Sequence, residues 1–282
     1  MHAVLPKGTG ESSVKMNDIE KDNVSGAKGR SSIATRPLQV LSHYPAIPPP
    51  LDIPLTWLPD HACPYLPGRV AADRAIWAGS APAAVYEKFM DAGFRRSGKL
   101  LYQPACRGCR DCLSIRVPLP LFQPNKSQRR CARRNADLVI SRGAPRCSDE
   151  KFALYCKYVT GWHGRADVEG PAGFESFLYD SPVESTLEFE YRSPDSRLLA
   201  VGICDLCPTV LSSVYLYFDP AESQRGLGTF AALHEIEFAR RQSLKYYYLG
   251  YWVRDCQSMQ YKQNFGPNEV LCADGIWRPR LI

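Results

Sequence analysis

The chain has 282 residues and a formal net charge of +6; 45% of its residues are hydrophobic and 23% are charged. This balance is typical of a soluble globular protein, and the length favours two domains over one. No apolar run approaches the roughly 20 residues that a membrane-spanning helix needs. The first residues also lack the basic and apolar regions of a secretory signal, so we expect a cytoplasmic protein without a membrane segment.

The N-terminal part of the chain divides into a tail and a domain. Residues 1–37 are rich in glycine, serine, lysine and aspartate without apolar periodicity, which predicts a disordered tail. A domain is predicted over residues 38–144, with a helix capped by Ser80, a strand over residues 113–121 and a helix over residues 127–137. Two prolines inside the predicted strand should confine it to the edge of a sheet.

A turn-rich break at residues 141–145 predicts the start of a C-terminal domain over residues 145–282. Ser148, which two acids follow, should cap a helix. Three strands, a helix and a fourth strand are then predicted over residues 185–191, 198–204, 210–218, 226–242 and 245–253. We therefore predict an α+β fold of two domains, the second acetyltransferase-like, with a mixed sheet flanked by helices.

The predicted helix over residues 127–137 is strongly basic. Its four arginines recur at a spacing of four, so they form two adjacent stripes on the helix surface. Residues 123–146 hold seven lysines and arginines against one acid, which weakens the alternative of a merely solvated face. We predict that the phosphates of a nucleic acid bind to Lys126, Arg129, Arg130, Arg133 and Arg134.

Eleven cysteines, an odd number, without a secretory signal argue against a framework of disulfides. Cys106, Cys109 and Cys112 are evenly spaced, and Cys63 is the candidate for a fourth ligand. Such a group can bind zinc or an iron–sulfur cluster. The alternative is a set of reduced cysteines in the core.

Residues 219–229 predict a loop that leads into a helix. Gly226 and Gly228 have the spacing of the loop that receives cofactor phosphates at a helix N-terminus in acetyltransferases. Ser223 stands where those enzymes usually carry Gln or Arg, which argues against acetyl-CoA. The same geometry suits an RNA phosphate, so we add Arg225, Gly226 and Gly228 to the predicted nucleic-acid contacts, with an ordinary helix start as the alternative.

The last predicted strand, residues 245–253, is rich in tyrosine. Alternation places Tyr246 and Tyr248 on one face and Tyr247 and Tyr251 on the other. A strand of this kind beside the loop would line a ligand cleft; aromatic packing in the core is the alternative.

Several of these stretches together resemble the arginyl-tRNA–protein transferase family, and most closely its bacterial aspartate/glutamate leucyltransferase branch. The matching runs are residues 63–69, 102–116, 122–130, 215–230, 248–252 and 258–262. The resemblance implies an aminoacyltransferase that moves leucine from leucyl-tRNA to the N-terminal Asp or Glu of an acceptor protein. This transfer marks the acceptor for degradation by the N-end rule.

The resemblance also bears on cofactors. Eukaryotic relatives carry N-terminal cysteines associated with an iron–sulfur cluster, whereas the cysteines of this chain differ from them in spacing. The aminoacyl ester is already activated, so the transfer requires no ATP, acetyl-CoA or other cofactor. The attacking α-amine has an ordinary pKa of about 8, so a base or a desolvated cleft must present it in neutral form.

We place the active cleft near the predicted loop and the tyrosine-rich strand, at Tyr217, Asp219, Tyr248, Tyr251 and Trp252. Asp219 is the candidate for holding the incoming ammonium or acting as the base, with an Asp-Pro turn as the alternative. The acidic side chain of the acceptor requires a cation, and the candidates are Lys262, Arg254 and Arg69. Ordinary solvated side chains are the alternative for all three.

Two other functions remain open from the residues alone. The same chemistry would serve arginyl transfer, because the donor pocket cannot be read from one sequence. A non-enzymatic tRNA- or RNA-binding protein with a structural metal would also explain the cysteines and the arginines. A small-molecule N-acetyltransferase is disfavoured by Ser223.

Overall fold

The computed structural model describes residues 47–280, so the predicted tail over residues 1–37 lies outside the described residues. The strands of the N-terminal part are β1 (Thr56–Trp57), β2 (His61–Ala62), β3 (Val70–Ala71), β4 (Asp73–Trp77), β5 (Arg95–Ser97), β6 (Leu100–Pro104) and β7 (Leu113–Pro118). The later strands are β8 (Val139–Gly143), β9 (Thr186–Arg192), β10 (Leu198–Leu206), β11 (Val210–Phe218), β12 (Tyr246–Trp252), β13 (Glu269–Leu271) and β14 (Trp277–Pro279).

The helices are unevenly distributed along the chain. The α-helices are α1 (Ala83–Asp91), α2 (Lys126–Arg134), α3 (Asp149–His163), α4 (Pro171–Phe174), α5 (Leu227–Arg241) and α6 (Gln257–Gln260). Short helices of other kinds are η1 (Leu119–Leu121), η2 (Glu175–Tyr179), η3 (Pro220–Arg225) and η4 (Tyr261–Asn264). No helix in the described part of the chain is long and apolar enough to cross a membrane.

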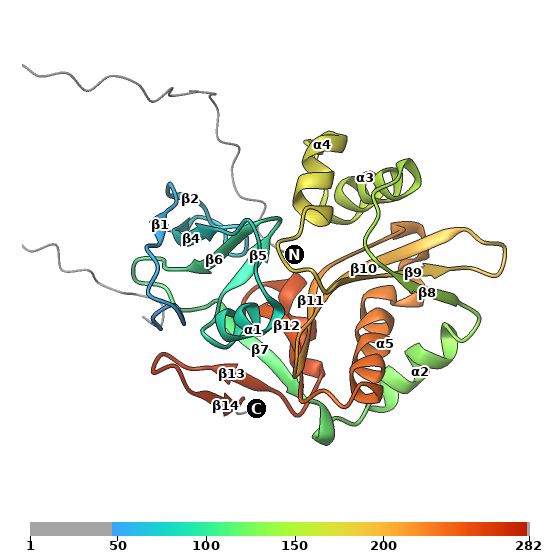
Figure 1. Cartoon of the computed structure of the whole chain (residues 1–282). Helices are drawn as coiled ribbons and strands as arrows, with labels where there is room; N and C mark the ends of the chain where they lie inside the picture. Colours follow the sequence, from blue (N-terminus) through green and yellow to red (C-terminus); the bar gives the residue numbers. More distant parts are fainter. Residues whose placement is uncertain (1–46, 281–282) are drawn as a thin grey trace, which may run out of the picture.

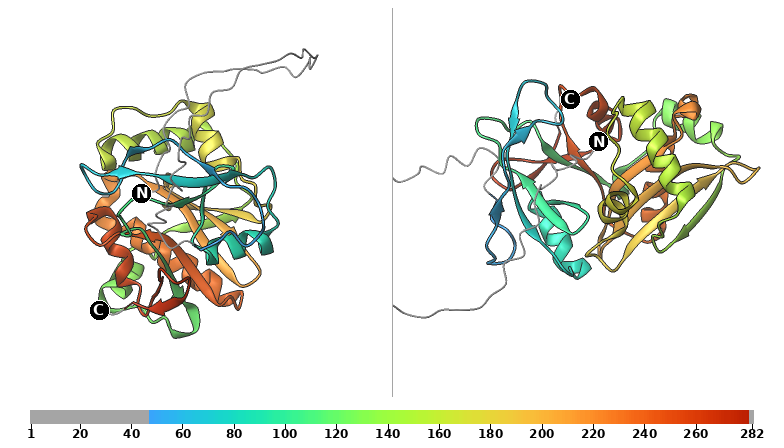
Figure 2. Two further views of the ribbon diagram at one scale, coloured as in Figure 1. Left: turned by 90° about the vertical axis from the view of Figure 1, so that its left-hand side faces the viewer. Right: turned by 90° about the horizontal axis from the view of Figure 1, so that it is seen from above.

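Two sheets form the frame of the molecule. The small sheet has the strand order β1-β4-β6-β5, and the large mixed sheet has the order β14-β13-β7-β12-β11-β10-β9-β8. The small sheet lies beside the large one, as Figures 1 and 2 show from three directions. The predicted α+β fold is thus confirmed, as is the predicted order of three strands, a helix and a fourth strand, which appears as β9, β10, β11, α5 and β12.

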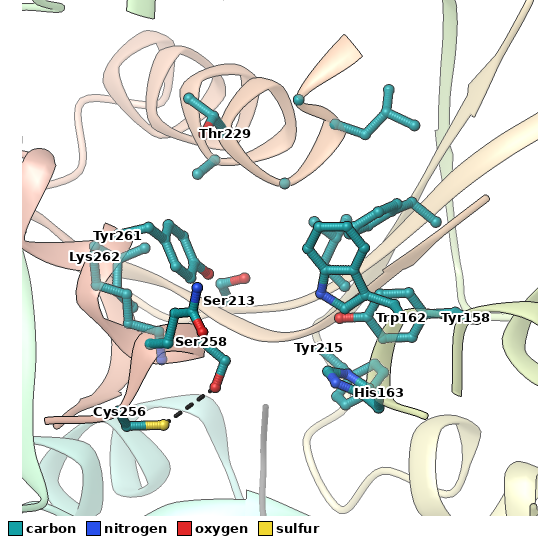
Figure 3. A pocket seen from close by; sticks show the side chains of 18 of the residues that line it. Tyr158, Trp162, His163, Ser213, Tyr215, Thr229, Cys256, Ser258, Tyr261 and Lys262 are labelled. Atoms are coloured by element: carbon teal, nitrogen blue, oxygen red, sulfur yellow. Dashed lines mark hydrogen bonds between the residues drawn. The ribbon is translucent and has the colours of Figure 1, made fainter. Parts of the chain in front are cut away.

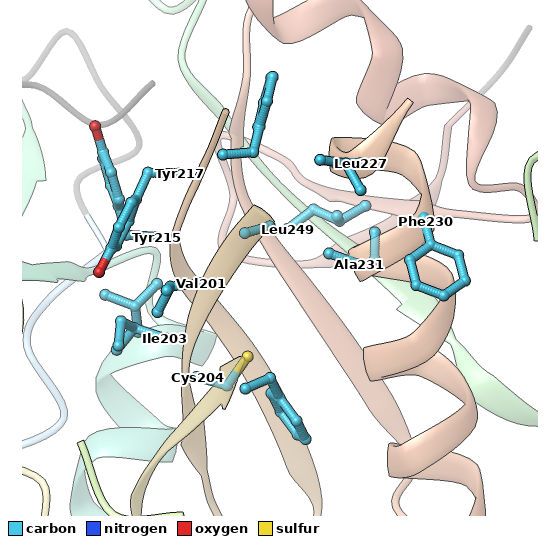
Figure 4. Packing of buried hydrophobic residues seen from close by; sticks show 14 of the residues in the cluster. Val201, Ile203, Cys204, Tyr215, Tyr217, Leu227, Phe230, Ala231 and Leu249 are labelled. Atoms are coloured by element: carbon cyan, nitrogen blue, oxygen red, sulfur yellow. The ribbon is translucent and has the colours of Figure 1, made fainter. Parts of the chain in front are cut away.

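Helices cover both faces of the large sheet. On one face, Tyr155 of α3 packs edge-on against Tyr217 of β11, with the ring centroids 5.8 Å apart. On the other face, α5 presents Leu227, Phe230 and Ala231 to the strands, and Figure 4 shows these side chains across the sheet from Tyr217. Many buried residues of the strands between these two helix layers belong to one large apolar core.

The predicted edge strand is an interior strand, which corrects the interpretation of its prolines. β7 lies between β12 and β13 in the large sheet and pairs with both of them in antiparallel fashion. Pro118 is the last residue of β7, and Pro120 belongs to the short helix η1 that follows. The prolines therefore end the strand instead of excluding neighbours from its sides.

Two predicted helix starts also differ. The helix α1 begins after Pro82 rather than at Ser80, because the Ala81 amide donates to the carbonyl of Pro182 and keeps the chain extended there. The basic helix α2 is capped by Asn125, whose side chain accepts from the Gln128 amide while Gln128 bonds back, a reciprocal capping box. The predicted cap of α3 at Ser148 is confirmed.

The predicted domain boundary near residue 144 falls inside one continuous sheet. β7 and β8 precede this point in the chain, whereas the strands between and beside them in the large sheet follow it. The N-terminal part of the chain therefore contributes strands to the sheet that the C-terminal part builds.

Candidate active site

A cavity opens where two neighbouring strands separate. β11 and β12 pair in parallel only from Val210–Ser212 to Tyr246–Tyr248. β12 then shifts its register against β7, and Gly250 lies in the bend with a φ of 80°, a conformation that side-chain-bearing residues rarely adopt. The separated stretches of both strands line a cavity of about 760 Å³.

Three elements close this cavity from different sides, as Figure 3 shows. Tyr158, Trp162 and His163 of α3 form one wall, and Tyr261 with Lys262 forms the opposite one. The first turns of α5 lie across the third side. Much of this lining is aromatic or aliphatic, with a few polar groups, as is usual for sites that bind small organic groups.

Lys262 and Glu235 are ionisable residues of the cavity lining that are almost completely buried, with exposed fractions of 3% and 1%. Burial lowers the pKa of Lys262 to about 7, and the neighbouring Arg95 cation acts in the same direction. Burial raises the pKa of Glu235 to about 7 against the opposing effect of its hydrogen bonds. Both side chains therefore change protonation near neutral pH, which is common at functional sites.

His163 adds a neutral imidazole to the wall. Burial lowers its pKa to about 4, and Arg165 contributes in the same direction. Its Nε2 atom is buried without a hydrogen-bond partner among the described residues.

The N-terminus of α5 faces the cavity through Gly226, Leu227 and Gly228. Gly226 caps this helix without a side-chain hydrogen bond. The first amides of an α-helix have no acceptors within the helix, so this end of α5 suits an anionic group.

The basic helix α2 supports the turn that leads into α5. The Asn135 side chain donates to the Arg225 carbonyl at 2.9 Å, and the Cys131 thiol lies 3.4 Å from the Gly226 carbonyl. Arg225 itself already pairs with Asp137 and Glu222, at 3.0 Å for each closest contact. The predicted tRNA contacts on α2 and at Gly226 and Gly228 thus lie together, whereas the charge of Arg225 is largely neutralised within the protein.

The five arginine and lysine side chains of α2 are exposed, and no carboxylate in the described part of the chain pairs with them. Arg129 donates to the Pro124 carbonyl and Arg134 to the Gln224 carbonyl. Uncompensated charges in this arrangement suit a polyanion that approaches the end of the cavity at α5.

Comparisons with known proteins show the family of this chain. The family described as arginine-tRNA-protein transferase matches residues 61–130 with its N terminus and residues 150–272 with its C terminus. An aspartate/glutamate leucyltransferase of Stenotrophomonas maltophilia (strain K279a) is 44% identical over 219 residues, covering 75% of this chain and 87% of that protein. Another, of Hahella chejuensis (strain KCTC 2396), is 40% identical over 223 residues, covering 77% and 93%.

The chain belongs to the aspartate/glutamate leucyltransferase family. The resemblance predicted from the sequence is thereby confirmed. Among solved structures, the crystal structure of FemX covers 66% of this chain and 65% of its own, with 10% sequence identity and a TM-score of 0.44.

The five residues predicted to form the active cleft of this leucyltransferase-family chain do not line the cavity. Tyr217 faces α3 and pairs its hydroxyl with that of Tyr179 at 2.8 Å. Asp219 accepts from the Ala221 amide at 3.0 Å and lies 3.5 Å from Arg197, as a helix-capping aspartate would. Their catalytic roles stay predictions, and other residues line the cavity.

Of the remaining three side chains of that set, Tyr248 and Tyr251 pack against the N-terminal part of the chain. Tyr248 bonds Asp91 and Arg116 through its hydroxyl. Tyr251 was expected on the same face as Tyr247, but the bend at Gly250 turns it so that its hydroxyl donates to the Gly93 carbonyl at 2.8 Å. Trp252 is buried, with its ring under Arg280 at 5.2 Å.

The three predicted cations for the acceptor occupy different places. Lys262 lines the cavity, and its ammonium group donates to the Tyr251 carbonyl at 2.6 Å. Arg69 pairs with Asp111 at 2.6 Å on the surface, and Arg254 is exposed with its guanidinium 6.0 Å from the Trp252 ring centroid. The structure thus separates Lys262 from the other two candidates.

The four predicted metal-ligating cysteines gather in one region. Burial raises the pKa of Cys112, and the neighbouring Cys106, Cys63 and Cys109 raise it further. The sulfur of Cys63 accepts from the Leu66 amide at 3.4 Å, and that of Cys106 accepts from the Ala72 amide at 3.5 Å. Within residues 47–280, no group of three or more His, Cys, Asp or Glu side chains is placed to hold a metal ion. Metal binding by these cysteines stays a prediction.

Glu235, His163 and Tyr261 were not predicted from the sequence. Glu235 had the one usable signal, since it is an acid within the apolar stretch of a predicted helix. Nothing near His163 or Tyr261 in the sequence indicates that they face the same cavity, because they come from α3 and η4, at opposite walls.

Proposed function

We propose that this chain transfers leucine from leucyl-tRNA to the N-terminal Asp or Glu of acceptor proteins and thereby marks them for degradation. The observation that carries the proposal is the 44% identity to an aspartate/glutamate leucyltransferase over 87% of that protein. The cavity supports it, because it combines apolar walls, a buried cation and a helix N-terminus. We place the reaction in the cytoplasm, where charged tRNA is available.

The walls suggest a position for the donor. Trp162, Phe218 and Leu249 give the leucyl side chain an apolar surface. The first turn of α5 can hold the phosphate or the ribose of the terminal nucleotide through its free amides. The rest of the tRNA then extends over the exposed arginines of α2.

Lys262 is the group that recognises the acceptor. Among the described residues of the lining, it is the only lysine or arginine. A buried ammonium forms a much stronger pair with a carboxylate than an exposed one does, because water does not screen it. The acceptor's side-chain carboxylate thus selects Asp and Glu over neutral N-terminal residues.

The chemistry is an aminolysis of the ester. The neutral α-amine attacks the leucyl carbonyl carbon, the bond from that carbon to the ribose oxygen breaks, and the ribose oxygen takes up a proton. The tetrahedral intermediate carries an oxyanion that needs hydrogen-bond donors in a dry site. A polar group of the wall can supply them.

The transfer assay tests this function directly. Labelled leucyl-tRNA is incubated with the protein and peptides that begin with Asp, Glu, Asn or Ala. We expect label mainly on the Asp and Glu peptides, with much slower transfer to the Asn and Ala peptides. Transfer from arginyl-tRNA but not from leucyl-tRNA would reassign the donor, and no transfer from either tRNA would exclude the function.

The arginines of α2 give a separate prediction. In the double variant Arg130→Gln/Arg133→Gln, we expect the dissociation constant for tRNA to rise about 10-fold, because two phosphate contacts are lost. The slope of log affinity against log salt should fall by about 2. Filter binding over a series of salt concentrations measures both quantities.

Arg241→Gln is the matched control, since Arg241 is an exposed arginine of α5 that pairs with Glu237. It should leave the affinity for tRNA and its salt dependence unchanged. An equal loss in the control and in the double variant would show that general charge, not the α2 surface, binds tRNA.

A further inference from the structure

Glu235 lies at the inner end of a helix face made of small residues. Gly228, Ala232 and Glu235 of α5 all line the cavity and follow one another at the spacing of a single helix face. Glycine and alanine leave open the space over the first two turns. Glu235 is therefore part of the cavity lining although it is only 1% exposed.

The carboxyl group is held from several strands. The Tyr247 hydroxyl of β12 donates to Oε2 at 2.5 Å. The Cys204 and Ser213 side chains also form hydrogen bonds with it. Gly202 of β10 lies beneath, where an added Cβ would be only 2.8 Å from Oε1. The hydrogen bonds thus fix the orientation of the carboxyl group, and the carboxyl group leaves no room for a side chain at residue 202.

The surroundings keep the pKa of the carboxyl group close to neutral pH, as a base that works at pH 7 requires. Burial raises its pKa to about 7, and the hydrogen bonds from Tyr247, Cys204 and Ser213 act against this rise. The titratable groups that face it are Tyr191 from β9, Cys204 from β10, Tyr247 from β12 and Tyr261 from η4. All four are neutral at pH 7, because their pKa values are raised.

We propose that the Glu235 carboxylate is the base that accepts a proton from the α-ammonium group of the acceptor. This proposal rests on the proposed leucyl transfer. The ammonium gives one proton to Glu235, and the resulting amine forms a bond to the leucyl carbonyl carbon. As the bond from that carbon to the ribose oxygen breaks, a second proton from the nitrogen passes to the ribose oxygen. The products are the leucyl amide, tRNA with a free hydroxyl group, and one proton, which protonated Glu235 returns to solvent.

A base at this place is chemically well matched to its substrate. The acceptor's α-ammonium has an ordinary pKa of about 8, within about one unit of the carboxyl group. Proton transfer between groups of similar pKa near the working pH is the favourable case for general base catalysis.

The variant Glu235→Gln tests the proposal, because it keeps the shape and removes the base. We expect kcat/KM for an Asp peptide to fall at least 100-fold at pH 7. The acidic limb of the wild-type pH profile, which follows deprotonation of Glu235 near pH 7, should disappear. Glu237→Gln on the exposed side of the same helix is the matched control and should behave like the wild type.

Tyr247→Phe provides a second readout that a structural role would not move. Without the donated hydrogen bond, the carboxylate is less stabilised, so the acidic limb should move to higher pH while the activity at high pH is retained. This variant also decides the case if Glu235→Gln does not fold, which circular dichroism would reveal.

The outcomes separate the two levels of the proposal. A wild-type chain that transfers no amino acid would overturn the proposed function itself. An active wild type together with a folded Glu235→Gln variant of undiminished kcat/KM would overturn only the role of Glu235. An acidic limb that stays in place in a folded Tyr247→Phe variant would do the same.

Discussion

Replacing Lys262 with methionine is expected to lower kcat/KM about 100-fold for acceptors that begin with Asp or Glu. Methionine has a similar length and keeps the cavity wall filled, but it removes the ammonium group that pairs with the acceptor carboxylate. A hydrogen bond to a charged group contributes about 1.5–3 kcal/mol, and the desolvated position of Lys262 favours the upper end. Peptide transfer kinetics at pH 7 measure the loss, which should appear mainly in KM.

Two comparisons make this expectation specific. Lys88→Met changes an exposed lysine of α1 and should leave kcat/KM unchanged. A peptide that begins with Asn lacks the carboxylate, so Lys262→Met should lower its much slower transfer little or not at all. Equal losses for Asp and Asn peptides would mean that Lys262 maintains the cavity instead of reading the acceptor.

The same variant predicts a change in the pH dependence of stability. The pKa of Lys262 is about 7 in the folded protein and 10.5 in the reference state, so the unfolded chain binds more protons between these values. The buried charge of Lys262 therefore lowers the free energy of unfolding by its full amount below pH 7, and this penalty disappears as the pH rises towards 10.5. Its size is roughly 5 kcal/mol.

Urea denaturation at several pH values measures this effect. The free energy of unfolding of the wild type should rise relative to that of Lys262→Met as the pH increases from 7 to 10. At pH 7, Lys262→Met should also be more stable than the wild type. The loss of the hydrogen bond to the Tyr251 carbonyl reduces this gain. A constant difference between the two proteins across this range would contradict the buried charge.

Much of the frame could be predicted because its signals are local. The strands β9, β10 and β11 and the helix α5 follow from alternation, apolar periodicity and turn residues within each segment. The interior position of β7 could not be predicted in this way. Its neighbours β12 and β13 come much later in the chain, and a proline at a strand end does not reveal whether neighbours pair along the strand before it.

The site was harder to predict than the fold. Lys262 was among three cations that the sequence could not rank, and only the cavity separates it from Arg69 and Arg254. The tyrosine-rich strand contributes Tyr247 and Leu249 to the cavity lining, but the bend at Gly250 redistributes its side chains, so that Tyr247 and not Tyr251 faces α5. Burial of an acid such as Glu235 depends on contacts from three other strands, which no local pattern contains.

Asp205→Ala is expected to destabilise the protein by about 3–5 kcal/mol, the cost of leaving a buried cation without its partner. Asp205 of β10 accepts from the Arg96 guanidinium of β5 at 2.7 and 2.9 Å, and both side chains are completely buried. Thr186 of β9 donates to the same carboxylate at 2.7 Å. The pair thus joins the small sheet to the large one, and thermal or urea unfolding measures its loss.

The double variant Arg96→Met/Asp205→Leu separates the cost of an unpaired charge from the value of the pair. Apolar residues of similar volume often replace a buried ion pair without loss, so the double variant should regain most of the stability that Asp205→Ala loses. Asp274→Ala, which removes the exposed pair with Arg278, should have little effect, because water screens that pair. If the double variant were as unstable as Asp205→Ala, the two sheets would depend on the specific geometry of the ion pair, and leucyl transfer should be lost together with stability.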